Sequence, residues 1–260
     1  MGLAVWTEDE AGPYGTHPYE TTSWQPQGEP LKQPHEYLPN GTAKIMTLFH
    51  PSDGQVRVKG VESVSNKVLH PWLKENLYQI VADLPPRMSP VSDEDNRAIW
   101  SGWRQDLTVK FTLPAQLPPL RLLLIGDNLA GHKTPEFVLW LCEQGILPLY
   151  TPLGGSWLNM AESMQNILKQ RALGGQNPTQ PQDIIYWFEA VAQVWNQHPT
   201  PFEWGGKRAQ RRQQVRLRKR HRLGASGAYT RYPIRRCLSL FEKWRCVSVM
   251  NYSRKLCGHV

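Results

Sequence analysis

Short apolar runs and longer amphipathic stripes alternate along most of the chain, and each type predicts a different element. Residues 3–10, 43–50 and 55–59 predict three strands, and a Ser-Asp-Gly turn joins the last two as a hairpin. Residues 63–83 carry apolar side chains every three to four positions, the spacing of a buried helix face. Pro71 lies inside this helix and predicts either a kink or a later start.

Further along the chain, strand and helix patterns alternate. An apolar strand over 120–125 is followed by a helix, a second strand over 146–150 and an amphipathic helix that begins near Asn159. A last broad apolar pattern predicts a helix over 183–197, with Val194 on its buried side. The helix that follows the 120–125 strand is predicted to bury one face, which consists of Phe137, Val138, Leu141 and Cys142. A strand–helix–strand unit of this kind forms a right-handed crossover between parallel strands.

This order of elements is that of the ribonuclease-H-like fold. The fold is α/β, with a mixed sheet of three antiparallel strands followed by two parallel strands, and helices flank the sheet. We expect one such domain over residues 1–204 and a basic C-terminal tail over 205–260. The proline-rich residues 85–119 are interpreted as an insertion, in which acids at 93–95 begin a helix and 107–113 form a strand.

The charge of the chain is divided unevenly. The net charge is +8, yet residues 201–260 hold 16 Lys and Arg against two acids, whereas residues 1–200 hold 14 against 20. Such asymmetry indicates a polyanionic partner for the basic part. Nine basic residues lie in 207–222: Lys207, Arg208, Arg211, Arg212, Arg216, Arg218, Lys219, Arg220 and Arg222. We expect them to bind the DNA backbone with little sequence preference, and the alternative is a solvated charged segment.

The cysteines and the hydropathy of the chain indicate in which cellular compartment the protein is expected. The four cysteines show no paired spacing of the kind that zinc sites use, and Cys142 is expected in the core. No apolar run reaches the roughly 18 residues that a membrane span requires, and no signal-peptide pattern opens the chain. We therefore expect a cytoplasmic protein with free thiols and no membrane partner.

Three carboxylates follow predicted strands or begin a predicted helix. Asp9 ends the first strand, before Ala11-Gly12-Pro13, which is expected to break it; Asp127 ends the fourth strand, and Glu162 lies on the later helix. The first and fourth strands are neighbours in this fold, so Asp9 and Asp127 should meet although 117 residues separate them. Clustered carboxylates repel one another unless a cation neutralises them, and hard oxygen ligands suit Mg²⁺ or Mn²⁺.

These residues carry a resemblance to a known family. The motifs are Thr7-Glu8-Asp9-Glu10-Ala11-Gly12, Ser23-Trp24-Gln25-Pro26-Gln27-Gly28, Gly126-Asp127-Asn128 with His132, and Ser156-Trp157-Leu158-Asn159 with Glu162 and Lys169. Together, with 34 residues between Asp127 and Glu162, they resemble the DDE transposases of the mariner superfamily, and most of all the bacterial insertion-sequence type. The resemblance spans about residues 3–205.

The resemblance implies a function and a set of partners. Asp9, Asp127 and Glu162 would be the catalytic residues and would bind two Mg²⁺ or Mn²⁺ ions. The chemistry would be DNA strand cleavage and strand transfer, with element ends and a TA target as DNA partners. A homodimer assembled on paired ends, in a bacterial cytoplasm and associated with the nucleoid when bound to DNA, is also implied.

Each member of the site has an alternative interpretation. Glu8 or Glu10 could replace Asp9 as the ligand, and Asp127 with Asn128 could simply start a turn. Asn159 and Glu162 have the spacing of a capping box, which is compatible with a catalytic Glu162. The supporting residues have different expected roles. His132 is typical of a structural loop and Trp157 of a packing anchor, whereas Lys169, two turns after Glu162, is expected to contact a phosphate.

The resemblance also has a limit. Relatives of this family carry helix-turn-helix modules ahead of the first catalytic strand, whereas this sequence starts at that strand. We expect either separately encoded DNA recognition or a truncated copy, which puts autonomous transposition in doubt. Two competing hypotheses are a non-catalytic DNA-binding remnant of a transposase and a cellular ribonuclease-H-like nuclease.

Overall fold

The computed structural model describes residues 3–21, 27, 29, 32, 34–86, 91–105, 107, 110–155 and 158–202, then residue 213 and the backbone of two short strands. The chain divides into one unit, Met1–Phe202, and a second unit, Glu203–Val260. All the helices and the large sheet described below belong to the first unit.

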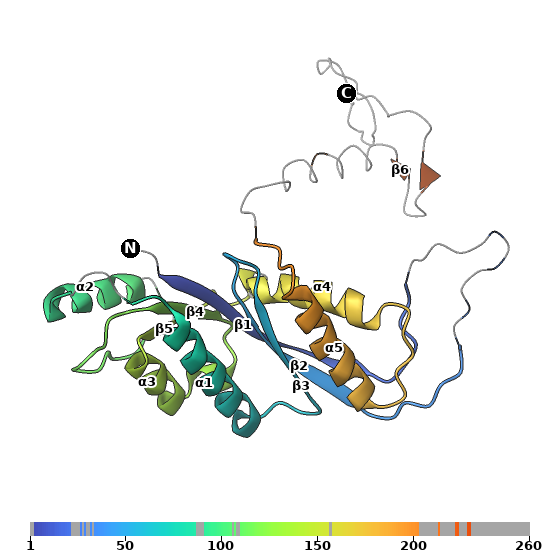
Figure 1. The fold of residues 1–260 in the computed structure, drawn as a ribbon, viewed down its shortest axis with the longest axis horizontal. Helices are drawn as coiled ribbons and strands as arrows, with labels where there is room; N and C mark the ends of the chain where they lie inside the picture. Colours follow the sequence, from blue (N-terminus) through green and yellow to red (C-terminus); the bar gives the residue numbers. More distant parts are fainter. Residues whose placement is uncertain are drawn as a thin grey trace, which may run out of the picture. The chain divides into compact units, whose positions relative to one another are not determined.

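A five-stranded mixed sheet is the centre of the first unit, with strand order β3-β2-β1-β4-β5 (Figure 1). β1 (Ala4–Gly15), β2 (Thr42–Phe49) and β3 (Val56–Val61) are antiparallel neighbours. β4 (Leu122–Gly126) is parallel to β1, and β5 (Ile146–Tyr150) is parallel to β4. This is the sheet of a ribonuclease-H-like fold, so the predicted fold class is confirmed.

Helices cover both faces of this sheet. α1 (Asn66–Asp83) and α3 (Pro135–Glu143) pack on one face, over a cluster that includes Met46 and Leu48. α4 (Met160–Leu173) and α5 (Pro181–Trp195) pack on the other face, and α2 (Asp93–Arg104) contributes Trp100 to a third cluster with Leu123 and Leu147. Because successive strand residues point to opposite faces, Ile45 and Met46 belong to different clusters.

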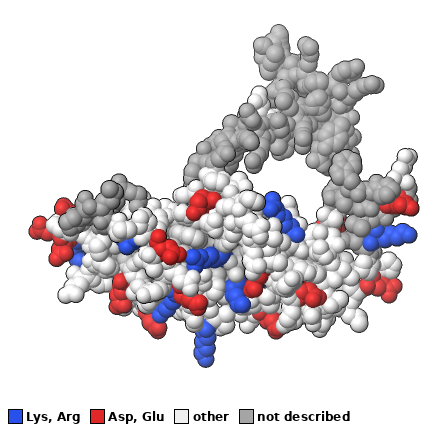
Figure 2. All heavy atoms as spheres, viewed as in Figure 1, with Lys and Arg blue, Asp and Glu red and all other residues white. Residues whose placement is uncertain are grey.

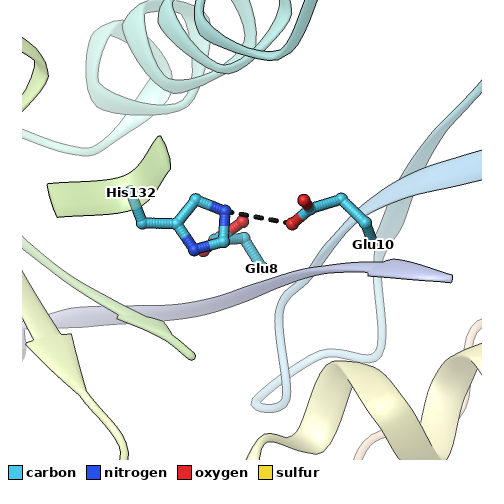
Figure 3. Close-up of side chains that lie close together, drawn as sticks. All are labelled: Glu8, Glu10 and His132. Carbon is cyan, nitrogen blue, oxygen red and sulfur yellow. Dashed lines mark ion pairs between the residues drawn. The ribbon is translucent and has the colours of Figure 1, made fainter. Parts of the chain in front are cut away.

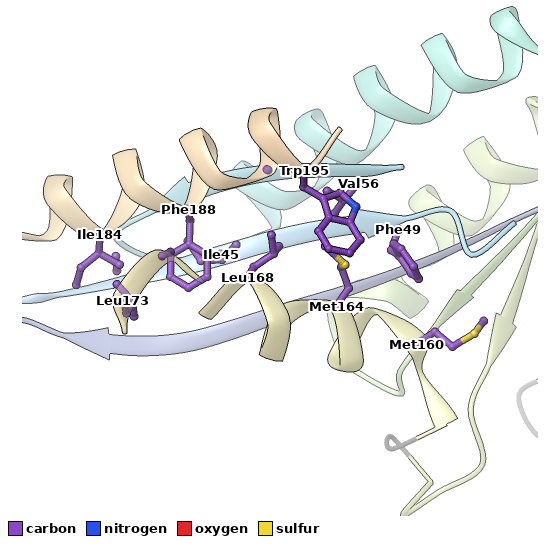
Figure 4. Close-up of a cluster of buried hydrophobic side chains, with 13 residues drawn as sticks. Ile45, Phe49, Val56, Met160, Met164, Leu168, Leu173, Ile184, Phe188 and Trp195 are labelled. Atoms are coloured by element: carbon purple, nitrogen blue, oxygen red, sulfur yellow. The ribbon is translucent and has the colours of Figure 1, made fainter. Parts of the chain in front are cut away.

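The cluster beneath α4 and α5 fixes the position of α4 (Figure 4). Leu168 is fully buried and Phe188 is 1% exposed, and both lie against Ile45 of β2. Burying an aliphatic or aromatic side chain of this size stabilises the fold by roughly 1.5–3 kcal/mol. Trp195 ends α5 and donates its indole N–H to the carbonyl of Gly54, 2.7 Å away, which joins α5 to the β2–β3 turn.

The first strand is longer than the sequence predicts. Ala11-Gly12-Pro13 was expected to end it, yet β1 continues to Gly15. The register against β2 shifts between Ala11 and Tyr14, so an irregularity in the strand accommodates the proline. Gly12 adopts φ 115°, a conformation that L side chains rarely take, and a Cβ there would lie 2.9 Å from the carbonyl oxygen of Ala43.

Two smaller predictions are also wrong, and one of the two alternatives for Pro71 is excluded. α1 runs through Pro71 rather than starting after it, and Pro71 lies on the exposed side of the helix, where water can satisfy the unpaired carbonyl. The described residues between 107 and 113 form no strand, although the acids at 93–95 do begin α2 as expected. Val194 is 62% exposed because α5 buries only one stripe against the sheet.

Little of the second unit is described. β6 (Arg222–Leu223) and β7 (Ala228–Tyr229) pair antiparallel. The basic side chains of 207–222 lie outside the described residues, so the predicted tail over 205–260 and its DNA contacts stay predictions. Among the helices that the structure describes, none is both long and apolar enough to cross a membrane.

Candidate active site

The pairing of β1 with β4 brings Asp9 and Asp127 to the same end of the sheet. The two strands are parallel, and the last pair in their register joins Thr7 to Ile125. Asp9 and Asp127 each follow two residues later, so both carboxylates lie where the parallel strands finish pairing. The carboxyl end of parallel strands is where α/β sheets place functional crevices.

Alternation along β1 then separates Asp9 from its acidic neighbours. Asp9 lies opposite Thr47 of β2, whose hydroxyl accepts a hydrogen bond from Gln165 of α4 at 3.4 Å. Glu8 and Glu10 lie opposite Leu48 and Met46, which belong to the core under α1 and α3. Since directly opposed residues share a face, Asp9 faces α4, and Glu8 and Glu10 face α1 and α3.

Asn159 positions the start of α4 against β1. Its side-chain oxygen accepts from the Ala161 amide at 3.2 Å, and its amide group donates to the Glu8 carbonyl at 2.6 Å. Glu162 lies in the first turn of this helix, so the contact to Glu8 brings it towards the β1 segment that holds Asp9. Among the described hydrogen bonds, Glu162 makes no side-chain bond back to Asn159, so the pair is not a reciprocal capping box.

Electrostatics couple the three carboxylates. Burial, together with the negative charges of Asp127, Glu10 and Glu162, raises the pKa of Asp9 to about 7, and a hydrogen bond from the Glu10 amide opposes this shift. The pKa of Asp127 is lowered, mainly by its hydrogen bond with His132. Asp9 therefore resists ionisation beside the other carboxylates, and a divalent cation bound by their oxygens would relieve this repulsion.

His132 lies close to Glu8 and Glu10 (Figure 3), which the register of β1 places on the opposite side of the strand from Asp9. Its Nδ1 is 3.1 Å from both Glu8 Oε1 and Asp127 Oδ1, and its Nε2 is 3.0 Å from Glu10 Oε2 as an ion pair without a hydrogen bond. Burial disfavours the charged imidazole, but Glu8, Asp127 and Glu10 raise the pKa of His132 to about 11. Burial also raises the pKa of Glu8, to about 8.

The Glu8–Glu10–His132 cluster is itself able to hold a metal ion. One ligand atom from each residue lies within 4.8 Å of the others. The structure therefore presents two groups of potential ligands, one on each side of β1, and Asp127 lies close to both because its Oδ1 contacts His132.

The loop after β4 is held by Asn128. Its amide group donates to the carbonyl of Thr151, and its side-chain oxygen accepts from Lys133 Nζ at 3.2 Å. Lys133 lies 6.0 Å from the ring centroid of Tyr150, and the Tyr150 hydroxyl donates to the His132 carbonyl at 2.8 Å. Asn128 thus supports the loop that presents Asp127, and Lys133 adds a cation beside it that sequence reasoning did not identify.

Lys169 lies on the exposed side of α4, with its Nζ 5.8 Å from the ring centroid of Tyr14. Burial raises the pKa of Tyr14 to about 12, and the charges of Tyr19 and Asp9 contribute. Trp157 lies outside the described residues.

The sequence predicts Glu8 and Glu10 only as alternatives to Asp9, and it does not predict their contact with His132. The signal was present in the alternation of β1, which places them together and away from Asp9. A buried glutamate in a central strand requires a partner, and His132 was already a candidate residue.

Comparisons with known proteins add little to this description. No protein-family model matches the chain, and no curated protein matches it. Among solved structures, the catalytic core domain of BIV integrase aligns over 88% of this chain and 91% of its own, at 13% identity and a TM-score of 0.36. A pre-cleavage Mos1 transpososome aligns over 77% of this chain and 57% of its own, at 13% identity and a TM-score of 0.40. The fold class rests on the strand order and pairing described above.

Proposed function

We propose that the first unit is the catalytic domain of a DDE transposase, which cleaves and joins DNA strands by metal-dependent phosphoryl transfer. One observation carries this proposal: three carboxylates from separate elements converge beside the end of the β1–β4 pair. Asp9 comes from β1, Asp127 follows β4, and Glu162 lies in the first turn of α4, which Asn159 ties to β1. The transposase-like motifs around the same residues support this interpretation.

The three carboxylates are proposed to bind the metal ions. Two divalent cations, when bound, would supply a clamp for the attacking and leaving oxygens of an in-line displacement. Asp9, Asp127 and Glu162 would hold them, because all three offer hard oxygen donors. Asp127 Oδ1 is already engaged by the Leu129 amide at 2.7 Å and by His132, so its other oxygen is the one to bind a cation.

DNA is the proposed substrate, with the element ends and the target as its two forms. Lys169 beside Tyr14 would contact a backbone phosphate near Asp9. Figure 2 shows acidic and basic side chains interspersed over the described part of the face that it draws. This favours the 207–222 run, with nine Lys and Arg, as the main source of non-specific affinity. The proposal also includes Mg²⁺ or Mn²⁺ as the metal and a dimer assembled on paired ends. It further includes an insertion-sequence origin and a bacterial cytoplasmic setting.

Strand cleavage tests this function. The full chain would be incubated with labelled duplexes that span the ends of its own element, with Mg²⁺ or Mn²⁺, and binding would be measured separately. We expect the wild type to nick the duplex at the element end. The nicking rate should fall by about two orders of magnitude or more in Asp127→Asn and in Glu162→Gln. Glu75→Gln, an exposed carboxylate on α1, is the matched control and should cleave normally.

Each competing hypothesis gives a distinct result. A transposase remnant would bind the duplexes but show the same background cleavage in wild type and Asp127→Asn. A cellular nuclease would cleave DNA or RNA–DNA hybrids without regard to element ends. Either result would remove the proposed function.

A further inference from the structure

The Glu8–Glu10–His132 cluster lies behind the proposed site, and the scheme above uses only the contact of His132 with Asp127. His132 and Glu8 each leave only 3% of the side chain exposed, and Glu10 leaves 15%. A buried polar group requires a partner, and His132 is the partner that Glu8 contacts among the described ion pairs. The imidazole faces carboxylates at both nitrogens, as Figure 3 shows for Glu10.

The strand before Asp127 is shaped around Glu8. A Cβ placed on Gly126 would collide with Glu8 Oε1, so the carboxylate occupies the space that a side chain at this position would fill. Glu8 therefore lies directly against the backbone that leads into Asp127. Only glycine at 126 allows this approach without displacing the carboxylate.

Asp127 is held at one oxygen. The Leu129 amide and His132 Nδ1 both contact Oδ1, at 2.7 Å and 3.1 Å. Among the described residues, none donates a hydrogen bond to Oδ2. His132 is in turn oriented by Glu8 at the same nitrogen and by Glu10 at the other. The chain of contacts runs from the interior of the sheet to one oxygen of Asp127 and leaves the second oxygen available.

We propose that Glu8, Glu10 and His132 act as a positioning group that fixes the Asp127 carboxylate for metal binding, with the imidazole rather than a metal ion between the carboxyl groups of the cluster. His132 is a positioning residue, because it reaches the reaction only through Asp127. This inference rests on the proposed function in taking Asp127 as a metal ligand. Partners that orient metal ligands commonly change metal affinity by 10–100-fold when they are removed.

The experiment compares two double variants of the full chain. Glu8→Gln removes the buried charge in both, so that loss of the imidazole does not leave it unpaired. His132→Leu then removes the donor to Asp127, whereas His132→Asn keeps one N–H group near the position of Nδ1. Mn²⁺ affinity of the DNA-free protein would be measured by calorimetry at matched folded fractions, and hydrogen exchange would report on the Leu129 amide. His198→Asn, at an exposed position, is the control.

We expect the Leu double variant to bind Mn²⁺ 10–100-fold more weakly, and the Asn double variant to recover most of the loss. Exchange at the Leu129 amide should be about tenfold faster or more in the Leu double variant, as loss of a hydrogen bond to a charged group implies. If the cluster only stabilises the fold, the two double variants should lose Mn²⁺ affinity equally and exchange the Leu129 amide equally fast. That result overturns the inference.

Two further outcomes are decisive. If one bound Mn²⁺ survives Asp127→Asn but is lost in Glu10→Gln, the cluster is a metal site and the positioning role is wrong. If the wild type binds no Mn²⁺, the proposed function fails, and the Leu129 amide still decides whether His132 holds Asp127. Unchanged exchange in the Leu double variant then overturns the positioning role as well.

Discussion

Asp9→Asn tests whether the proposed site is under electrostatic stress in the absence of metal. In the folded chain, burial together with Asp127, Glu10 and Glu162 raises the pKa of Asp9 from 3.8 to about 7. Between these pH values the folded chain retains a proton that the unfolded chain has released. The free energy of unfolding therefore falls as the pH rises through this window, and the loss is complete above about pH 7.

The magnitude follows from the same pKa values. A difference of about three pKa units corresponds to roughly 4 kcal/mol, at 1.36 kcal/mol for each unit. Asn carries no charge at any pH and has nearly the shape of Asp. We therefore expect Asp9→Asn to stabilise the metal-free chain by about 2–4 kcal/mol at pH 8, with the gain falling towards zero near pH 4.

Urea unfolding in EDTA at pH 4, 5, 6, 7 and 8 measures this gain as a shift in midpoint at constant slope. Glu75→Gln, an exposed carboxylate on α1, should show no such dependence. Mn²⁺ at about 100 times its Kd should stabilise the wild type by roughly 2.7 kcal/mol and leave Asp9→Asn unchanged. Equal midpoints for wild type and Asp9→Asn at pH 8 would refute the account of the site as a cluster of repelling carboxylates.

Four other predictions follow from the structure. Phe188→Ala should lower the free energy of unfolding by about 3–5 kcal/mol in urea, and a loss under 1 kcal/mol would contradict its place in the core. Asn159→Ala should lower the free energy of unfolding in guanidinium by about 1–2 kcal/mol, because the helix cap and the hydrogen bond to the Glu8 carbonyl are lost. An unchanged unfolding midpoint would count against both contacts. The rise in Tm on adding Mn²⁺ should be larger at pH 8 than at pH 6, since Asp9 is ionised above its pKa of about 7, and an equal rise would exclude Asp9 as a ligand. Replacing the nine basic residues of 207–222 by Gln should flatten the dependence of log K on log salt, by about 0.9 for each phosphate contact removed, and an unchanged slope would exclude this segment.

The sequence predicted the order of strands and helices, because each element repeats its own period of apolar residues. It also predicted that β1 and β4 would be neighbours, and the register confirms this. Where local chemistry conflicts with long-range pairing, the pattern misled. Gly12-Pro13 has the composition of a strand break, yet pairing with β2 carries β1 on to Gly15.

The sequence by itself therefore determined the order of the sheet strands and of the helices around them, and that Asp9, Asp127 and Glu162 are candidates for one site. Only the tertiary structure decided which helices each side of β1 faces, and that His132 contacts Glu8 and Glu10. The physical reason is that local periodicity depends on neighbouring residues, whereas the partner of a buried charge comes from another strand or loop. His132 reaches Glu8 across 123 intervening residues, a contact that packing creates and that no local pattern encodes.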